Sequence, residues 1–455
     1  MSADHSKGNR FLYIAQEFSL PLLAGVVVAL VIANTTPKLY NKIVNQTYAF
    51  FVAEQDHQPG QPSHDHQDHG NEHHDHEKEV PSNAEHAENH GHVSGWRHYC
   101  TLHFIINDLF MVLFFGIAAK EIAESCLPGG ALNPITKAVN PLMGTIGGVL
   151  GPVGVYLLLN AMIGQPEWFW GWGIPTATDI ALAWLIARVV FGTGHPAISF
   201  LLLLAVADDG IGLLIIAFVY PTNDPAWLNL LWIIPGMAIA LGLRIRNIQA
   251  WTPYIFIGGA FSWWGLYSAH LHPALALVPI VPFLPGPKRD EGLFRDDITT
   301  IETDPLNRFE HDLKLPVDFG LFFFAFANAG VQFESMSNLT WIVLLSLLIG
   351  KTVGISLFSW AGSVFGFPLP DGMKIKHLVV AGVIAGLGLT VALFVAHQAF
   401  SDADFRGASK MGALFSGGIA ILAIILGRML GVKDGGIQDG DANDQSETQP
   451  IQPTK

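Results

Sequence analysis

The chain alternates between long apolar runs and short polar stretches. Each run contains about 20 residues, the length that an α-helix needs to cross the roughly 30 Å hydrocarbon core of a bilayer. This pattern excludes a soluble globular protein and favours one polytopic, all-α membrane domain. The eighth run is the shortest and contains Pro279, Pro282 and Pro285. In total the runs predict about twelve spans, near residues 18–40, 102–124, 140–163, 169–191, 196–220, 226–243, 250–269, 272–286, 315–333, 340–364, 375–400 and 408–431.

Lysine and arginine are distributed unequally among the short loops. With the N-terminus inside, the short outer loops contain only Arg406 and Lys410, and the cytoplasmic segments contain nearly all the others. Positively charged loops stay in the cytoplasm. We therefore predict a multi-pass protein of the inner membrane, with both termini cytoplasmic. We see no cleavable signal peptide, so the first run is expected to remain as a span.

Polar segments interrupt or flank the predicted membrane domain. Residues 1–17 form a cytoplasmic N-terminus, residues 18–431 the transmembrane domain, and residues 432–455 an acidic, disordered cytoplasmic tail. An insertion at 54–93 follows the first span and is predicted to be periplasmic and disordered. Much of the net charge of −14 comes from the insertion and the tail, so the charge does not indicate a nucleic-acid partner.

The insertion is rich in histidine. Such tracts bind zinc, copper or nickel, but the ligand spacing here is not specific. Two interpretations stay open: a solvated linker with incidental metal affinity, or a physiological metal site. The candidate zinc ligands are His64, His66, His69, His73, His74 and His76.

Cys100 and Cys126 are the only cysteines. They flank one predicted helix, which separates them by about 39 Å. A disulfide requires Cα atoms within about 7 Å, so we predict two free thiols.

Four charged residues lie near the middle of predicted spans. Asp208 and Asp209 are adjacent in one span, Asp179 is in the preceding span, and Lys351 is in a much later one. Ionisable residues inside a membrane are costly and mark ion or proton pathways. At 1.5 Å per residue all four lie at a similar depth, which predicts one ion site.

The helix geometry suggests different roles for the two adjacent aspartates. Neighbouring residues point about 100° apart, so one aspartate can pair with Lys351 while the other faces a cavity. Asp209, Asp179 and the Thr178 hydroxyl would then offer oxygen ligands to a hard cation. Protons and the cation would compete for these oxygens. If the site faces one side of the membrane at a time, that competition is antiport.

Two of the predicted spans contain interruptions. Pro175 precedes Asp179, and Gly386, Gly388 and Thr390 occur within AGLGLTVALF. Two interrupted spans in corresponding halves are typical of secondary transporters. The alternative for the second element is glycine placed for close helix packing.

Several motifs together resemble the NhaA-type sodium/proton antiporter family. The resemblance implies inverted-topology repeats and two broken helices that cross near the midplane. It also implies that Asp209 is the main cation-binding carboxylate, that Asp208 pairs with Lys351, and that Thr178 and Asp179 belong to the first broken helix. The matching strings, from about residue 100 onward, are TLHFIINDLFMVLFF, IPTATDIALA, AVADDGIGLLIIAFVY, EHDLKLPVDFGLFFFAFANAGV, LLIGKTVGISLF and AGLGLTVALFVAHQAF.

The same resemblance implies residues that respond to pH. Glu121, Glu310 and His311 match family positions at the cytoplasmic mouth, and His272 matches a pH-linked histidine near the outer face. Histidine titrates in the physiological range, which suits a sensor. The alternative for each residue is a hydrated loop or interface position.

The chain also departs from the family pattern. Glu124 replaces a basic residue, Lys314 stands where a second cytoplasmic histidine is expected, and Asp312 replaces an apolar residue. These changes put the pH threshold in question. The insertion replaces an outer hairpin that helps the family to dimerise, so a homodimer formed by that route is also in question.

The resemblance implies a pH-dependent, electrogenic exchange of Na⁺, or Li⁺, for two protons, without a cofactor and without enzymatic chemistry. The partners would be sodium, protons and membrane lipid. One rival is an exporter of divalent metal that is fed by the insertion. Another is a non-transporting sensor built on a transporter-like core. The oxygen ligands at the core argue against the first rival, and the complete charged set argues against the second.

Overall fold

The computed structural model describes residues 20–45, 101–287 and 304–432, apart from 129, 131, 134, 222 and 223. Within these ranges the chain forms helices and no β-strand. Six helices are long and apolar enough to cross a membrane, or eight if each of two bent pairs counts as one span. The protein is therefore an all-helical, multi-pass membrane protein, as the apolar runs predict.

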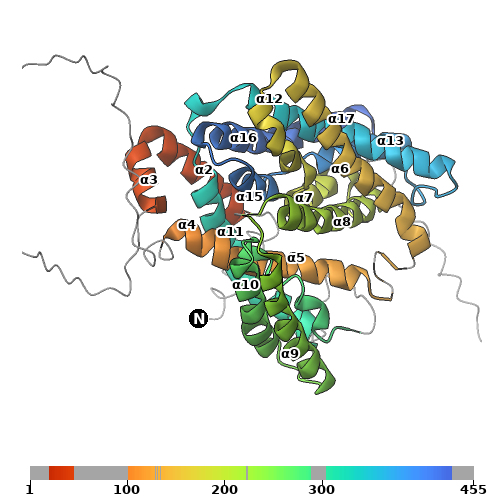
Figure 1. Ribbon diagram of the computed structural model, residues 1–455. Helices are drawn as coiled ribbons and strands as arrows, with labels where there is room; N and C mark the ends of the chain where they lie inside the picture. Colours follow the sequence, from red (N-terminus) through yellow and green to blue (C-terminus); the bar gives the residue numbers. More distant parts are fainter. Residues whose placement is uncertain are drawn as a thin grey trace, which may run out of the picture.

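The long helices form the body of the molecule (Figure 1). Several contain a short change of pitch, so that two labelled elements make one span. The six are Leu102–Ser125 with α4 (Leu102–Phe104) and α5 (Met111–Ser125), α6 (Ile135–Ile163), α8 (Pro196–Val219), Trp227–Ile245 with α9 (Ile233–Ile245), Asn338–Val364 with α12 (Asn338–Leu345) and α13 (Lys351–Val364), and Ala403–Met429 with α16 (Ala403–Phe415) and α17 (Ile419–Met429).

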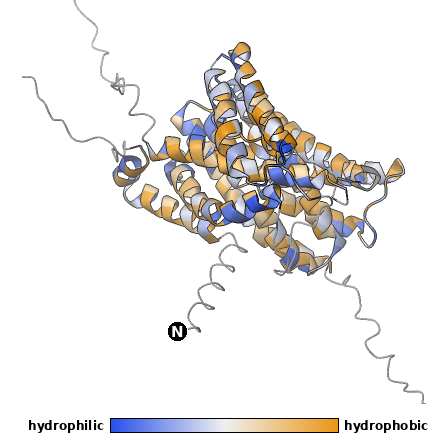
Figure 2. Ribbon diagram, turned by 90° about the horizontal axis from the view of Figure 1, so that it is seen from below, coloured by the Kyte–Doolittle hydropathy of each residue, from blue (hydrophilic) through white to orange (hydrophobic). Residues whose placement is uncertain are grey.

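Figure 2 shows many hydrophobic residues along these helices, and several large apolar side chains are exposed. Leu158 on α6, Phe218 on α8 and Ile245 on α9 are each at least 60% exposed. A soluble protein rarely leaves large contiguous apolar surface in water. A lipid-facing surface explains the exposure, because hydrocarbon tails are as apolar as these side chains.

Two bent pairs confirm the predicted interruptions. The helix over Pro166–Thr176 bends by 58° into α7 (Ile180–Phe191), and α14 (Ile375–Ala385) bends by 51° into α15 (Thr390–Ala399). Pro175 has non-helical backbone angles at the first break.

Three predicted spans differ in the structure. The first separates at Thr36 into α2 (Leu20–Thr35) and α3 (Pro37–Asn45), and the ninth begins earlier, as α11 (Pro305–Asn328). The eighth, 272–286, was wrong as a helical span: it contains only two short 3₁₀ turns, Pro273–Leu275 and Val281–Phe283. Its prolines lack the N–H groups that a continuous helix requires. This buried segment lies beside α10 (Gly259–Ser268) and α5 instead.

The two ends of the segment 46–100 leave the described structure from the same end of the molecule, because α3 packs against α4. The predicted insertion and its histidines lie outside the described residues, as do the tail after Val432 and Cys100. Cys126 is a free, exposed thiol.

Candidate functional site

The breaks of the two bent pairs contact each other directly. The backbone N–H of Asp179 donates to Leu387 O (2.7 Å), and the Thr178 hydroxyl lies 2.9 Å from Ala385 O. Each break therefore supplies hydrogen-bond partners to the other. This exchange satisfies groups that would otherwise be buried without a partner.

The Asp179 side chain accepts hydrogen bonds from both broken helices. Its Oδ1 accepts from the backbone N–H of Leu182 (3.1 Å), which caps the N-terminus of α7. Its Oδ2 accepts from the Thr390 hydroxyl (3.1 Å) at the start of α15. A carboxylate is favoured at a helix N-terminus, where the unpaired N–H groups and the helix dipole are positive. Asp179 is thereby held at the crossing point.

Asp208 forms the ion pair with Lys351 that the sequence predicts. Its Oδ2 pairs with Lys351 Nζ, and both side chains are fully buried. Thr178 Oγ1 completes the group, 2.9 Å from Asp208 Oδ2 and 2.8 Å from Lys351 Nζ. The Thr178 hydroxyl, which we expected beside Asp209, thus lies on the ion pair.

Asp209 differs from its neighbour in its surroundings. It is 9% exposed, and its Oδ1 is buried with no hydrogen-bond partner among the described residues. Asp208 Oδ1 is also without one. A buried acceptor without a donor is costly. A proton or a bound cation would satisfy either oxygen.

Helix packing brings Lys351 to this position. Gly147 and Gly151 on α6 face Gly350 and Gly354 at the start of α13, and a Cβ added at Gly151 would lie 2.9 Å from Gly354 Cα. Such small-residue pairs, four positions apart, let membrane helices approach closely. A π-helical turn, Ser346–Gly350, immediately precedes Lys351. Turns of this kind often occur at functional sites.

The start of α8 is fixed by a histidine. His195 is the N-cap, and its Nδ1 accepts from the Ala197 N–H (3.1 Å). Burial lowers the pKa of His195. The ring therefore stays neutral and keeps the lone pair that the cap requires.

Comparison with known proteins identifies the family. Residues 79–430 match the model of the family described as Na⁺/H⁺ antiporter 1. The chain belongs to this family. It is 53% identical over 421 residues to the Na⁺/H⁺ antiporter NhaA of Desulfitobacterium hafniense (strain DSM 10664 / DCB-2), a match covering 92% of this chain and 95% of the relative. It is 52% identical over 425 residues to NhaA of Geobacter metallireducens, covering 92% and 98%.

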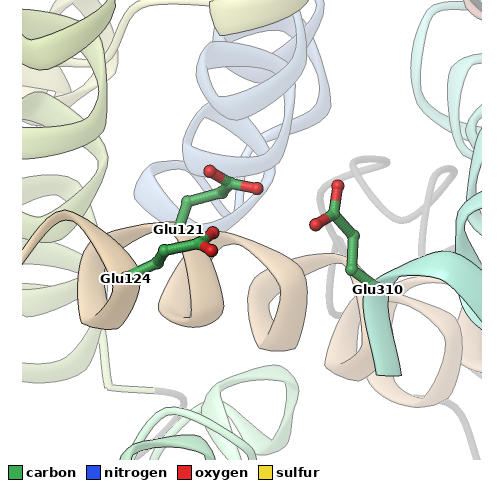
Figure 3. Close-up of side chains that lie close together, drawn as sticks. All are labelled: Glu121, Glu124 and Glu310. Carbon is green, nitrogen blue, oxygen red and sulfur yellow. The ribbon is translucent and has the colours of Figure 1, made fainter. Parts of the chain in front are cut away.

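Two of the three positions predicted at the cytoplasmic mouth, Glu121 and Glu310, form a cluster with Glu124 around Lys120. Lys120 Nζ lies 2.5 Å from Glu310 Oε2 and 3.5 Å from Glu121 Oε1, and it also pairs with Glu124. Figure 3 shows Glu121 and Glu124 on α5 and Glu310 approaching from α11. Oxygens of the three carboxylates lie within 4.8 Å of one another. The lysine supplies the positive charge that offsets their repulsion.

The two predicted histidines lie in different environments. His311 is on α11 beside Glu310, but its side chain is 79% exposed and lies 3.6 Å from Asp312, away from the cluster. His272 is buried, its Nδ1 accepts from the Ala274 N–H (3.2 Å), and its Nε2 lies 2.9 Å from Gln398 Nε2. Only His272 is packed within the protein.

Two residues that contribute to these sites, Lys120 and Thr390, were not predicted as site residues from the sequence. Lys120 stands four residues before Glu124, a spacing that places both on one helix face. A lysine and a glutamate at this spacing inside an apolar span could have indicated a buried ion pair. Thr390 was part of the interrupted motif, but its contact with Asp179 depends on how two distant breaks meet.

Replacing Lys120 by methionine is expected to destabilise the protein. The change leaves three neighbouring carboxylates without their counter-charge, and breaking a buried ion pair costs about 3–5 kcal/mol. Thermal unfolding of the purified variant, with the pH profile of transport measured alongside, checks this. Lys314→Met, an exposed position on α11, is the matched control. Equal unfolding temperatures for both variants would contradict the role of Lys120.

Proposed function

We propose that this chain exports sodium, and also lithium, in exchange for protons, with Asp209 and Asp179 as cation ligands. The observation that carries the proposal is the burial of three carboxylates and one lysine where two broken helices meet. Membership of the Na⁺/H⁺ antiporter family supports the activity. The protein is a secondary transporter rather than an enzyme, and the exchange requires no cofactor.

The coupling follows from the unpartnered carboxylate oxygens. Asp208 Oδ1 and Asp209 Oδ1 are buried acceptors that a proton or a hard cation can each satisfy. Binding of one displaces the other, because the same oxygens serve both. We infer two protons per cation from the family resemblance, which makes the exchange electrogenic.

Alternating access would involve the two broken helices. We propose about twelve spans arranged as inverted-topology repeats, with the breaks crossing near the midplane. In such transporters one bundle rocks against another around a fixed site. The hydrogen bonds between Thr178 and Ala385 and between Asp179 and Thr390 support a shared hinge at the crossing.

We place the chain in the inner membrane with both termini cytoplasmic. Residues 1–17 and 432–455 would be cytoplasmic and 54–93 periplasmic, interrupting a transmembrane domain of residues 18–431. The lysine and arginine bias supports this orientation, as does the common exit of both ends of the segment 46–100. We propose that lipid surrounds the domain. We also propose a homodimer whose interface does not use the outer hairpin of the family.

The pH response would reside at the two ends of the molecule. We propose that Glu121 and Glu310 act with Lys120 at the cytoplasmic mouth, and that His272 acts near the outer face. His311 would contribute only from solvent, since it is exposed. Zinc binding by the His-rich insertion remains a separate hypothesis, since its residues lie outside the described structure.

Ion flux by the purified full-length chain in liposomes tests the proposed function. We expect sodium-dependent proton movement that varies with pH and responds to an imposed membrane potential, as electrogenic exchange requires. Zinc movement without sodium movement would favour the metal exporter. Absence of all flux would favour the non-transporting sensor. Repeating the assay with added zinc, with and without residues 54–93, separates a role of the insertion from transport.

A further inference from the structure

A polar cavity of about 340 Å³ lies at the far end of the protein from the Lys120 cluster. His103 lines it at the first turn of the helix Leu102–Ser125, whereas Lys120 lies near the last turn of the same helix. The other walls come from α3, α16 and the chain after α11. The transport site described above does not include this cavity.

Lys410 is buried in the wall of this cavity without a counter-ion. It is 8% exposed, and its Nζ makes one long hydrogen bond, 3.4 Å, to Asn328 Oδ1. Among the described residues it forms no ion pair with a carboxylate. Burying an ammonium group with so little compensation is costly. An anion in the cavity would remove that cost.

Two further groups of the cavity can bind an anion. Arg406, one turn before Lys410 on α16, is half-buried; it makes no ion-pair contact within the described part of the chain, and the Asp402 carboxylate acts on its charge from a longer distance. His397 Nδ1 is buried without a hydrogen-bond partner there. The carboxylate in the lining is the exposed Asp404; nearby Asp402 is engaged in capping α16 (2.9 Å to the N–H of Asp404).

We propose that this cavity binds a phosphate-class oxyanion through Lys410 and Arg406, with His397 as an additional donor. A guanidinium offers a planar fork that matches phosphate oxygens, and lysine adds a point charge. A metal ion is disfavoured in the same place, because two cationic side chains flank the histidines. The lining of the cavity thus favours an anion over a divalent metal.

The surroundings give two sources for the anion. α3 forms one wall, buries Tyr40 against the protein, and exposes Lys38 and Lys42. An amphipathic helix with exposed lysines is typical of the headgroup level of a membrane. The ligand can therefore be the phosphate of an anionic lipid or free phosphate from solution.

Binding to the full-length protein tests the proposal. In detergent, we expect inorganic phosphate to raise the unfolding temperature of the natural chain more than chloride of equal ionic strength does. In nanodiscs, we expect phosphatidylglycerol to stabilise it relative to phosphatidylcholine alone. Lys410→Gln should weaken phosphate or lipid binding about tenfold or more, as expected for loss of a charged hydrogen bond.

Lys314→Gln is the control, since it removes an exposed lysine on α11 that lies outside the cavity lining. Arg406→Gln is the second variant if Lys410→Gln does not fold. Stabilisation by phosphate in detergent identifies a free-phosphate site, and stabilisation by phosphatidylglycerol alone identifies a lipid site. Equal responses of the natural chain and both cavity variants to phosphate and to lipid would overturn the proposal. Sodium flux is not part of this readout, so failure here leaves the transport proposal intact.

Discussion

Asp209→Asn is expected to abolish sodium-dependent dissipation of a proton gradient in everted membrane vesicles. The asparagine amide can neither release a proton nor provide a negative charge to a hard cation. Asp209 Oδ1 has no hydrogen-bond partner among the described residues, so this oxygen is available to the transported ion. Loss of about 3 kcal/mol of charge interaction corresponds to a loss of flux of roughly 100-fold or more.

Two matched variants sharpen this test. Asp371→Asn changes an exposed aspartate and should retain full flux. Asp208→Asn should also lose flux, but it should lose thermal stability as well, since it breaks the pair with Lys351. Asp209→Asn should keep its unfolding temperature. Full sodium-dependent activity of Asp209→Asn would contradict its assignment as the main cation ligand.

Lys351→Ala is expected to destabilise the protein by about 3–5 kcal/mol, the cost of leaving one partner of a buried ion pair alone. The side chain is fully buried between Asp208 and the Thr178 hydroxyl. Its removal takes away the counter-charge and one hydrogen bond. We expect a lower unfolding temperature in detergent and a shifted pH profile of transport.

A double variant separates the ion pair from general packing. Lys351→Met with Asp208→Asn removes both charges and should be more stable than Lys351→Ala, because no buried charge remains alone. Transport should be absent in the double variant. An unchanged unfolding temperature together with an unchanged pH profile in Lys351→Ala would rule out the role assigned to this pair.

Family membership supports the exchange activity. The relatives from Desulfitobacterium and Geobacter are named Na⁺/H⁺ antiporters, and the burial of Asp208, Asp209 and Lys351 fits exchange of that kind. The proposed regulatory role belongs to the Lys120 cluster. Because Lys120 contacts all three glutamates, substitutions there test pH control separately from ion binding.

The sequence determined the class of protein and the positions of the charged residues. Apolar length alone predicts membrane helices, because the bilayer thickness fixes how many residues a span needs. Pro175 predicted the first break, because a proline removes a backbone donor at a known place. The charge pattern predicted that one of the two adjacent aspartates pairs with Lys351, because buried charges in lipid require partners. The family resemblance implied that this aspartate is Asp208, and the structure shows that pair.

The tertiary structure decided which side chains meet. A membrane helix can be apolar toward both lipid and protein, so its sequence does not reveal which face is inward. The contact of Thr390 with Asp179, the central place of Lys120 and the cavity around Lys410 all depend on helix rotation and on crossing geometry. The eighth run is the opposite case: its composition is apolar, but its four prolines prevent a continuous helix, and it forms a buried segment beside α5. Hydrophobicity determines which segments lie in the membrane, whereas helix packing determines which side chains contact each other.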